Sequence, residues 1–218
     1  VSRKEAVASS AMTGICDNYL GAFAISLRAS LPQMGLLAAL PQLAGAAFQL
    51  LSVWLCSHFR RRHAIVAGVV LQAAAVLGMA MVALLRPTHS VAWLIGLAVV
   101  YHACANFVQP QWRSWMGSIV PARRRGAFFA GRTRLTMITS FTVFACGGAL
   151  LGWFERFELA WLGFFFLLLL AAVGRGLSAW QLHLMHDPDQ HNLAGGTTFV
   201  DTLVRVRESF HDRAFREY

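Results

Sequence analysis

The chain has 218 residues, of which 57% are hydrophobic and only 13% are charged. Soluble domains carry roughly 25% charged residues, so a soluble fold of this length would leave much apolar surface in water. The formal net charge is +9, and all but one of the 19 basic residues are arginine. These arginines lie in short clusters between apolar stretches, and not along one helix face or in a tail rich in aromatics, which disfavours nucleic acid as a partner.

Six stretches are long and apolar enough to cross a bilayer as helices, for which about 20 mostly apolar residues are needed. In chain order they are residues 6–27, 34–56, 64–85, 91–111, 128–153 and 159–183. The first has Asp17 and Asn18 near its middle, and a basic run separates the second from the third. We therefore predict an all-α membrane protein, with a six-helix transmembrane bundle over residues 1–183.

The longest polar interruption within this bundle is residues 112–127, which we expect to form a basic loop between the fourth and fifth helices. Residues 184–218 have a different pattern. Phe199, Leu203, Val206 and Phe210 recur there at spacings of three and four, which is typical of an amphipathic helix. We expect a cytoplasmic linker whose helix lies at the membrane surface or against the bundle.

The basic residues divide unequally between the two sides of a six-helix bundle. The side with the N-terminus holds Arg3, Lys4, Arg60, Arg61, Arg62, Arg113, Arg123, Arg124, Arg125 and the four arginines of the tail, whereas the other side holds Arg28, Arg86 and Arg156. Positive charge is enriched in cytoplasmic loops, so both ends of this chain are predicted to be cytoplasmic. A soluble helical bundle with basic loops gives no reason for such an alternation.

The sequence around the 112–127 loop resembles a known family. The segment has a tryptophan pair, Trp112 and Trp115, then Pro121, and then an Arg-Gly-x-x-Phe run that starts at Arg125. Together with six spans and two basic loops on the cytoplasmic side, this segment resembles the N-terminal half of a transporter of the major facilitator superfamily. The resemblance covers the whole chain.

The resemblance implies a fold of two six-helix halves with the substrate at their interface, of which this chain would supply one and lack the C-terminal partner. It implies a secondary active transporter in the bacterial inner membrane, which moves a small solute by alternating access with a proton or cation. It also implies that the basic loops act as a cytoplasmic gate. The gating residues would be Arg60, Arg61, Arg62, Arg123, Arg124 and Arg125. No cofactor is expected.

Asp17 is the first candidate site residue, because a carboxylate near the middle of a membrane helix costs about 2.5–3.5 kcal/mol on insertion scales. It could couple transport to a proton or cation, contact a cationic substrate, or serve as a structural acid between helices. Thr13 lies on the same helix face, one turn away. The two side chains predict a polar stripe along a transport pathway, although small residues also allow close helix packing.

His102 and Asn106 are the matching candidates in the fourth stretch, where they are one helical turn apart. We interpret them as substrate contacts, with hydrogen bonding between helices as the alternative. Arg175, in the sixth stretch, is a possible charge partner for Asp17, although snorkelling towards the cytoplasmic interface is favoured. His183, His186 and His191 cluster at the end of the sixth stretch, but His183 and His186 have no third metal ligand at a recognised spacing, so no metal site is predicted.

No nucleotide-binding, hydrolase or metalloprotease motif is present in the 218 residues, so an enzyme has no site in this sequence. A six-span assembly or scaffold protein, or an enzyme embedded in the membrane, stays open as an alternative to a transporter. The residues do not identify the substrate, the direction of transport or the coupling ion.

Overall fold

The computed structural model describes residues 2–58 and 61–185, and within them the chain is helical apart from short connections. The helices are α1 (Ser2–Ser26), α2 (Leu31–His58), α3 (Arg61–Leu85), α4 (Ser90–Ile119), α5 (Ala122–Glu155) and α6 (Ala160–His183). The all-helical class predicted from the sequence is confirmed for this part of the chain. The predicted amphipathic helix of the tail lies outside the described residues.

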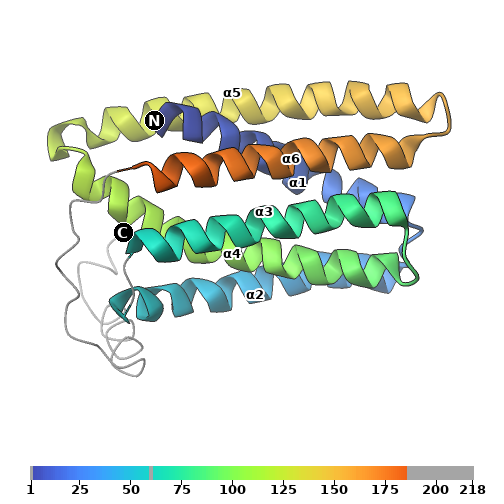
Figure 1. Ribbon diagram of the computed structural model, residues 1–218, viewed down its shortest axis with the longest axis horizontal. Helices are drawn as coiled ribbons and strands as arrows, with labels where there is room; N and C mark the ends of the chain where they lie inside the picture. Colours follow the sequence, from blue (N-terminus) through green and yellow to red (C-terminus); the bar gives the residue numbers. More distant parts are fainter. Residues whose placement is uncertain (1, 59–60, 186–218) are drawn as a thin grey trace, which may run out of the picture.

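The six helices run back and forth along one axis (Figure 1). Five of the described helices are long and apolar enough to cross a membrane, and α1 is the exception because serine, threonine, asparagine and aspartate lower its apolar content. The start of α1, the α2–α3 and α4–α5 connections and the end of α6 lie together at one end, which we call the basic end (Figure 1). This up-and-down order gathers Arg3, Arg62 and Arg123 at the basic end and leaves Arg28 and Arg156 at the other.

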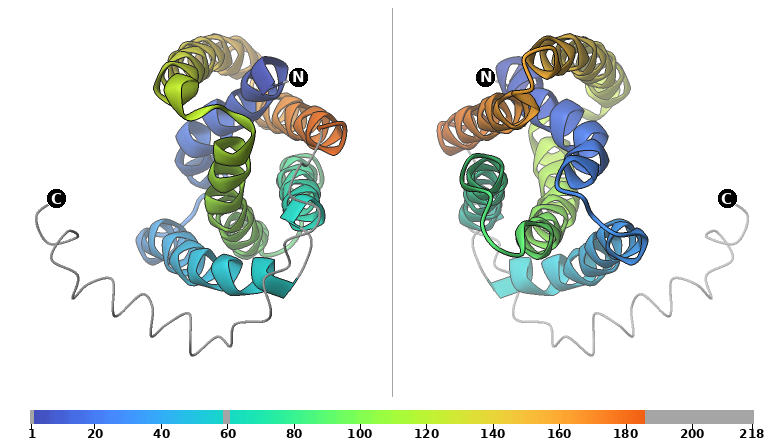
Figure 2. Two further views of the ribbon diagram at one scale, coloured as in Figure 1. Left: turned by 90° about the vertical axis from the view of Figure 1, so that its left-hand side faces the viewer. Right: turned by 90° about the vertical axis from the view of Figure 1, so that its right-hand side faces the viewer.

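Viewed along its axis, the bundle consists of two groups of three helices (Figure 2). One group contains α1, α5 and α6, and the other contains α2, α3 and α4. The two groups meet mainly where α3 packs against α6, whereas α1 and α2 barely touch. This division positions the candidate site, since a cavity described below lies between the two groups.

Small residues let the helices within each group approach closely. A Cβ atom added at Gly14 in α1 would lie 2.8 Å from Oγ of Ser140 in α5. One added at Gly174 in α6 would lie 3.0 Å from the backbone oxygen of Ala8 in α1. Close approach at small residues is the usual basis of helix association in membranes, where lipid gives no hydrophobic driving force between helices.

Buried apolar side chains form two cores along the bundle. The larger contains Phe23, Met79, Leu94 and Phe164 from α1, α3, α4 and α6. The smaller lies at the basic end, around the fully buried Trp115 of α4. Trp115 belongs to the tryptophan pair that carried the family resemblance, and Trp112, the other member, packs against the same core.

The predicted loop over residues 112–127 is wrong, because nearly all of this segment is helical. Helix α4 continues to Ile119 and α5 begins at Ala122, so the connection is Val120 and Pro121 alone. Arginine is a good helix former, and a run of arginines therefore marks the end of the membrane span and not the end of the helix. The chain turns where it does because a proline disfavours helical geometry at the residue before it, and Val120 is extended.

Candidate functional site

Asp17 is exposed to the surroundings of the bundle, although it lies in the second half of an otherwise mostly apolar helix. Its Oδ1 accepts a hydrogen bond of 3.0 Å from the hydroxyl of Tyr101 in α4. Tyr101 itself is 2% exposed and packs in the larger core. The bond joins the two helix groups and fixes the carboxylate on a surface that the other five helices do not cover.

The other predicted pathway residues lie on either side of this pair. Thr13 is half-buried, donates to the backbone oxygen of Ser10 and lines the cavity described below. His102 is half-buried and directly follows Tyr101. Asn106 instead donates to the backbone oxygen of His102 at 2.9 Å and packs against α2 at Gly45. The structure therefore places Thr13 and Asn106 at different helix contacts.

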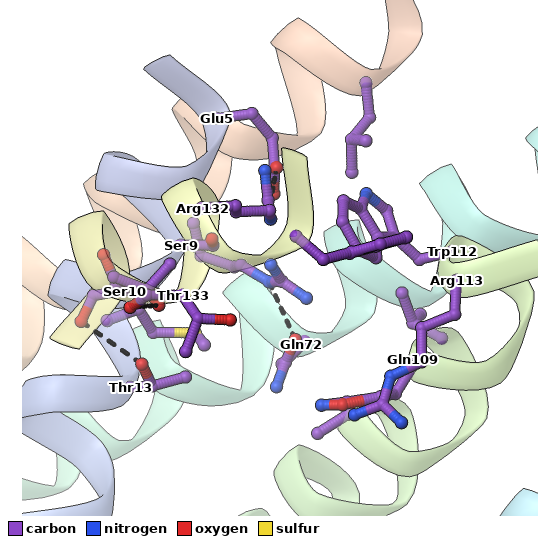
Figure 3. A pocket seen from close by; sticks show the side chains of 17 residues that line it. Glu5, Ser9, Ser10, Thr13, Gln72, Gln109, Trp112, Arg113, Arg132 and Thr133 are labelled. Carbon is purple, nitrogen blue, oxygen red and sulfur yellow. Dashed lines mark hydrogen bonds and ion pairs between the residues drawn. The ribbon is translucent and has the colours of Figure 1, made fainter. Parts of the chain in front are cut away.

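A cavity of about 750 Å³ opens between the two helix groups, towards the basic end (Figure 3). It is lined by Glu5, Ser9, Ser10, Met12, Thr13, Gln72, Ala105, Val108, Gln109, Trp112, Arg113, Phe129, Arg132, Thr133, Thr136, Arg175 and Leu182. Five helices contribute, with α1 and α5 facing α4 and the polar ends of Gln72 and Arg175 between them. Its volume is within the range of ligand pockets.

Contacts of Glu5 and Arg132 hold the walls of this cavity. Glu5 and Arg132 form an ion pair of 2.5 Å between α1 and α5, with side chains 4% and 14% exposed. Glu5 also accepts a hydrogen bond of 3.1 Å from the hydroxyl of Ser178 in α6. The guanidinium of Arg132 lies over the ring of Trp112 in α4, 4.1 Å from its centroid, so this one side chain bridges the two groups.

Arg175 continues the chain of polar contacts from α6 to α3. Its Nε donates to Oε1 of Gln72 at 2.7 Å, and its Nη1 lies 3.4 Å from the hydroxyl oxygen of Ser178. Gln72 in turn donates to the backbone oxygen of Tyr101 at 3.3 Å. Because Arg175 is only 8% exposed, the favoured snorkelling position is wrong. Among the described residues it forms no ion pair with Asp17.

Two of the predicted gating arginines, Arg62 and Arg125, contact helix ends. Arg62 donates to the backbone oxygen of His183, which ties α3 to the last turn of α6. Arg125 donates to the backbone oxygens of Val120 (3.0 Å) and Gly117 (2.5 Å). Such bonds satisfy the free carbonyls that end a helix. Arg123 and Arg124 are exposed, while Arg60 and the side chain of Arg61 lie outside the described residues.

The polar network contains residues that sequence reasoning passed over. Glu5, Gln72, Arg132 and Ser178 were all assigned to apolar stretches or their edges and given no role. For Glu5 and Arg132 the usable signal was the one applied to Asp17, namely an ionisable group in or beside a membrane helix. Within the described part of the chain, no three His, Cys, Asp or Glu residues gather as a metal site would require, and His186 and His191 lie outside that part.

The comparisons with known proteins agree with this architecture. The family model described as Major Facilitator Superfamily matches residues 6–215, which is nearly the whole chain. No curated protein matches the sequence, and no solved structure does so. The family match, over a bundle of long apolar helices, confirms the resemblance carried by the 112–132 segment. The chain belongs to the major facilitator superfamily of membrane transporters.

Proposed function

We propose that this protein is a secondary active transporter that moves a small solute across the bacterial inner membrane by alternating access. The observation that carries the proposal is the exposed carboxylate of Asp17, held by Tyr101 in the middle of the bundle. A charged group at that depth is costly unless it faces a partner or a water-filled path. Among the described residues, Asp17 accepts a hydrogen bond from Tyr101, and its side chain is exposed.

Asp17 is proposed to couple solute movement to a proton or another cation. When a carboxylate binds or releases a proton or another monovalent cation, the charge of its site changes by one unit. This change biases which conformation of the transporter is favoured. His102, next to Tyr101, and Thr13, between Asp17 and the cavity, would line the path of the solute. Asn106 would serve the same path where α4 meets α2.

The partner in alternating access is proposed to be a second six-helix half. Among the five candidate spans, those of α2 and α5 have the smallest buried shares of their apolar windows, at 17% and 6%. Large apolar side chains such as Leu43 and Phe141 are exposed on them. A bilayer or a second bundle would cover these faces. The basic end is proposed to be cytoplasmic, with residues 184–218 as the linker and the arginine clusters as parts of the gate.

The test is solute-driven proton movement in vesicles. The full-length natural protein is reconstituted in proteoliposomes that enclose a pH-sensitive dye, and sugars, peptides, organic cations and organic anions are added in turn. At least one class should change the internal pH, and Asp17→Asn should abolish the change while the amount of inserted protein is unaltered. An undiminished signal in Asp17→Asn would remove Asp17 from the coupling mechanism, and no signal with any class would count against proton coupling.

A further inference from the structure

The cavity between the two helix groups carries an excess of positive charge. Among the described residues that line it, Arg113, Arg132 and Arg175 are cationic and Glu5 is the one carboxylate. Lys and Arg buried in membrane proteins usually pair with an acid or face an aqueous cavity. Here a single buried acid serves a lining that contains three guanidinium groups.

Glu5 is already engaged by two donors. One of its oxygens accepts from Arg132 at 2.5 Å and the other accepts from Ser178 at 3.1 Å. Its side chain is 4% exposed, so a molecule in the cavity has little access to it. Glu5 forms its ion pair with Arg132, and one carboxylate cannot balance the three guanidinium groups of the lining.

Arg175 supplies the second observation. It is 8% exposed, lines the cavity, and has only the neutral partners Gln72 and Ser178 among the described residues. A guanidinium carries five N–H donors and stays charged in proteins. Two of the donors account for these contacts, which leaves three for an acceptor in the cavity. A buried arginine without a carboxylate partner is costly, and an anionic ligand would supply the missing charge.

The rest of the lining fits the same ligand. Arg113 and Gln109 follow one another along the α4 wall and are exposed to the cavity side (Figure 3). The indole Nε1 of Trp112 is buried, and it is a hydrogen-bond donor without a partner in the described part of the chain. Arginine forks match carboxylate and phosphate oxygens in pairs. A volume of about 750 Å³ is larger than an inorganic ion requires.

We infer that this cavity binds a small organic anion, bearing a carboxylate or a phosphate, between Arg113 and Arg175. The inference rests on the proposed transport function only for its role as a substrate site, since binding itself needs no gradient. The inferred solute is an anion, whereas the ion that Asp17 would bind is a cation. A proton or cation on Asp17 and an anion in the cavity would then cross together with less net charge.

The experiment measures binding to the purified full-length protein in a neutral detergent at low ionic strength. The probes are citrate, glucose 6-phosphate, glucose and tetraphenylphosphonium. Their binding is measured by thermal unfolding and by isothermal titration calorimetry. Citrate or glucose 6-phosphate should bind and raise the unfolding temperature, whereas glucose and the organic cation should not. Binding should weaken as salt is added, because ions screen the attraction. The two anions distinguish carboxylate from phosphate recognition.

Two variants and one control separate a binding role from a structural one. Arg113→Gln, in an exposed side chain, should weaken anion binding about tenfold or more, as expected for a lost hydrogen bond to a charged group. Arg175→Lys keeps the charge but loses the fork, and it should also weaken binding if the variant folds. Arg156→Gln removes an exposed arginine at the opposite end and should leave binding unchanged.

The inference would be overturned by no binding of either anion, by preferential binding of tetraphenylphosphonium, or by anion binding that Arg113→Gln leaves intact. Binding lost equally in Arg156→Gln would mean that general positive charge, and not the cavity, attracts the anion, and it would also overturn the assignment. A protein that binds the anions but shows no solute-driven proton movement keeps this inference and loses the proposed coupling. A transporter of cations alone keeps the coupling and loses this inference.

Discussion

Replacing Glu5 by glutamine tests the buried network most sharply, because it removes one charge and almost no volume. The change removes the charge on α1 that pairs with the guanidinium of Arg132. Removing one partner of a buried ion pair typically costs 3–5 kcal/mol. Since Arg132 is 14% exposed and lines a cavity, water can solvate it in part. We therefore expect the free energy of unfolding to fall by about 3 kcal/mol, at the lower end of that range.

The assay is reversible unfolding of the full-length protein in mixed micelles, followed by tryptophan fluorescence as the denaturing detergent is increased. Glu155→Gln, at an exposed position at the other end of α5, is the matched control and should change stability by less than about 0.5 kcal/mol. The double variant Glu5→Gln with Arg132→Gln should lose less than the sum of the single variants, because contacting residues are not additive. A cost below about 1 kcal/mol, or simple additivity, would refute the reasoning.

Three further predictions concern packing and the backbone. Gly14→Ala should destabilise the protein by about 1–3 kcal/mol through overpacking against α5, whereas Gly21→Ala, with no atom near the new Cβ, should not; equal effects would contradict the close crossing. Tyr19 donates a hydrogen bond to the backbone oxygen of Phe144. Tyr19→Phe should therefore lower the free energy of unfolding by about 0.6 kcal/mol, as for an average hydrogen bond between membrane helices. An unchanged free energy of unfolding would mean that this bond is not formed. Glu158→Gly should raise the unfolding temperature, because Glu158 has φ of 60° and glycine adopts that conformation without the cost of a Cβ; a lowered temperature would show that the turn is held differently.

The fold class and the family were predictable because both rest on patterns that are local in sequence. Apolar length predicts helices, and the 112–132 segment carried the family resemblance that the comparison confirmed. The connection between α4 and α5 was not predictable from polarity. A basic segment and a helix are compatible, and the position of Pro121 was the better guide to the turn.

The polar network was not predictable, because its members are far apart in the chain. Glu5 and Arg132 are 127 residues apart, and Gln72 and Arg175 are separated by 103. Each lies in or beside an apolar stretch, and nothing in the neighbouring sequence indicates its partner. The snorkelling expectation for Arg175 failed for the same reason, since it considered only the distance to the helix end. Asp17 stood out as a single residue, but its bond to Tyr101 required the packing of α1 on α4.

The central claim is that Asp17 couples solute movement to an ion gradient, and a comparison of two transport modes tests it most directly. In proteoliposomes loaded with the solute found by the proton-movement screen, we would measure exchange of labelled for unlabelled solute and, separately, accumulation driven by an imposed gradient. Asp17→Asn should retain exchange and lose accumulation, whereas Asn18→Ala, at the exposed neighbouring position, should retain both. Accumulation at the wild-type level by Asp17→Asn would contradict the account.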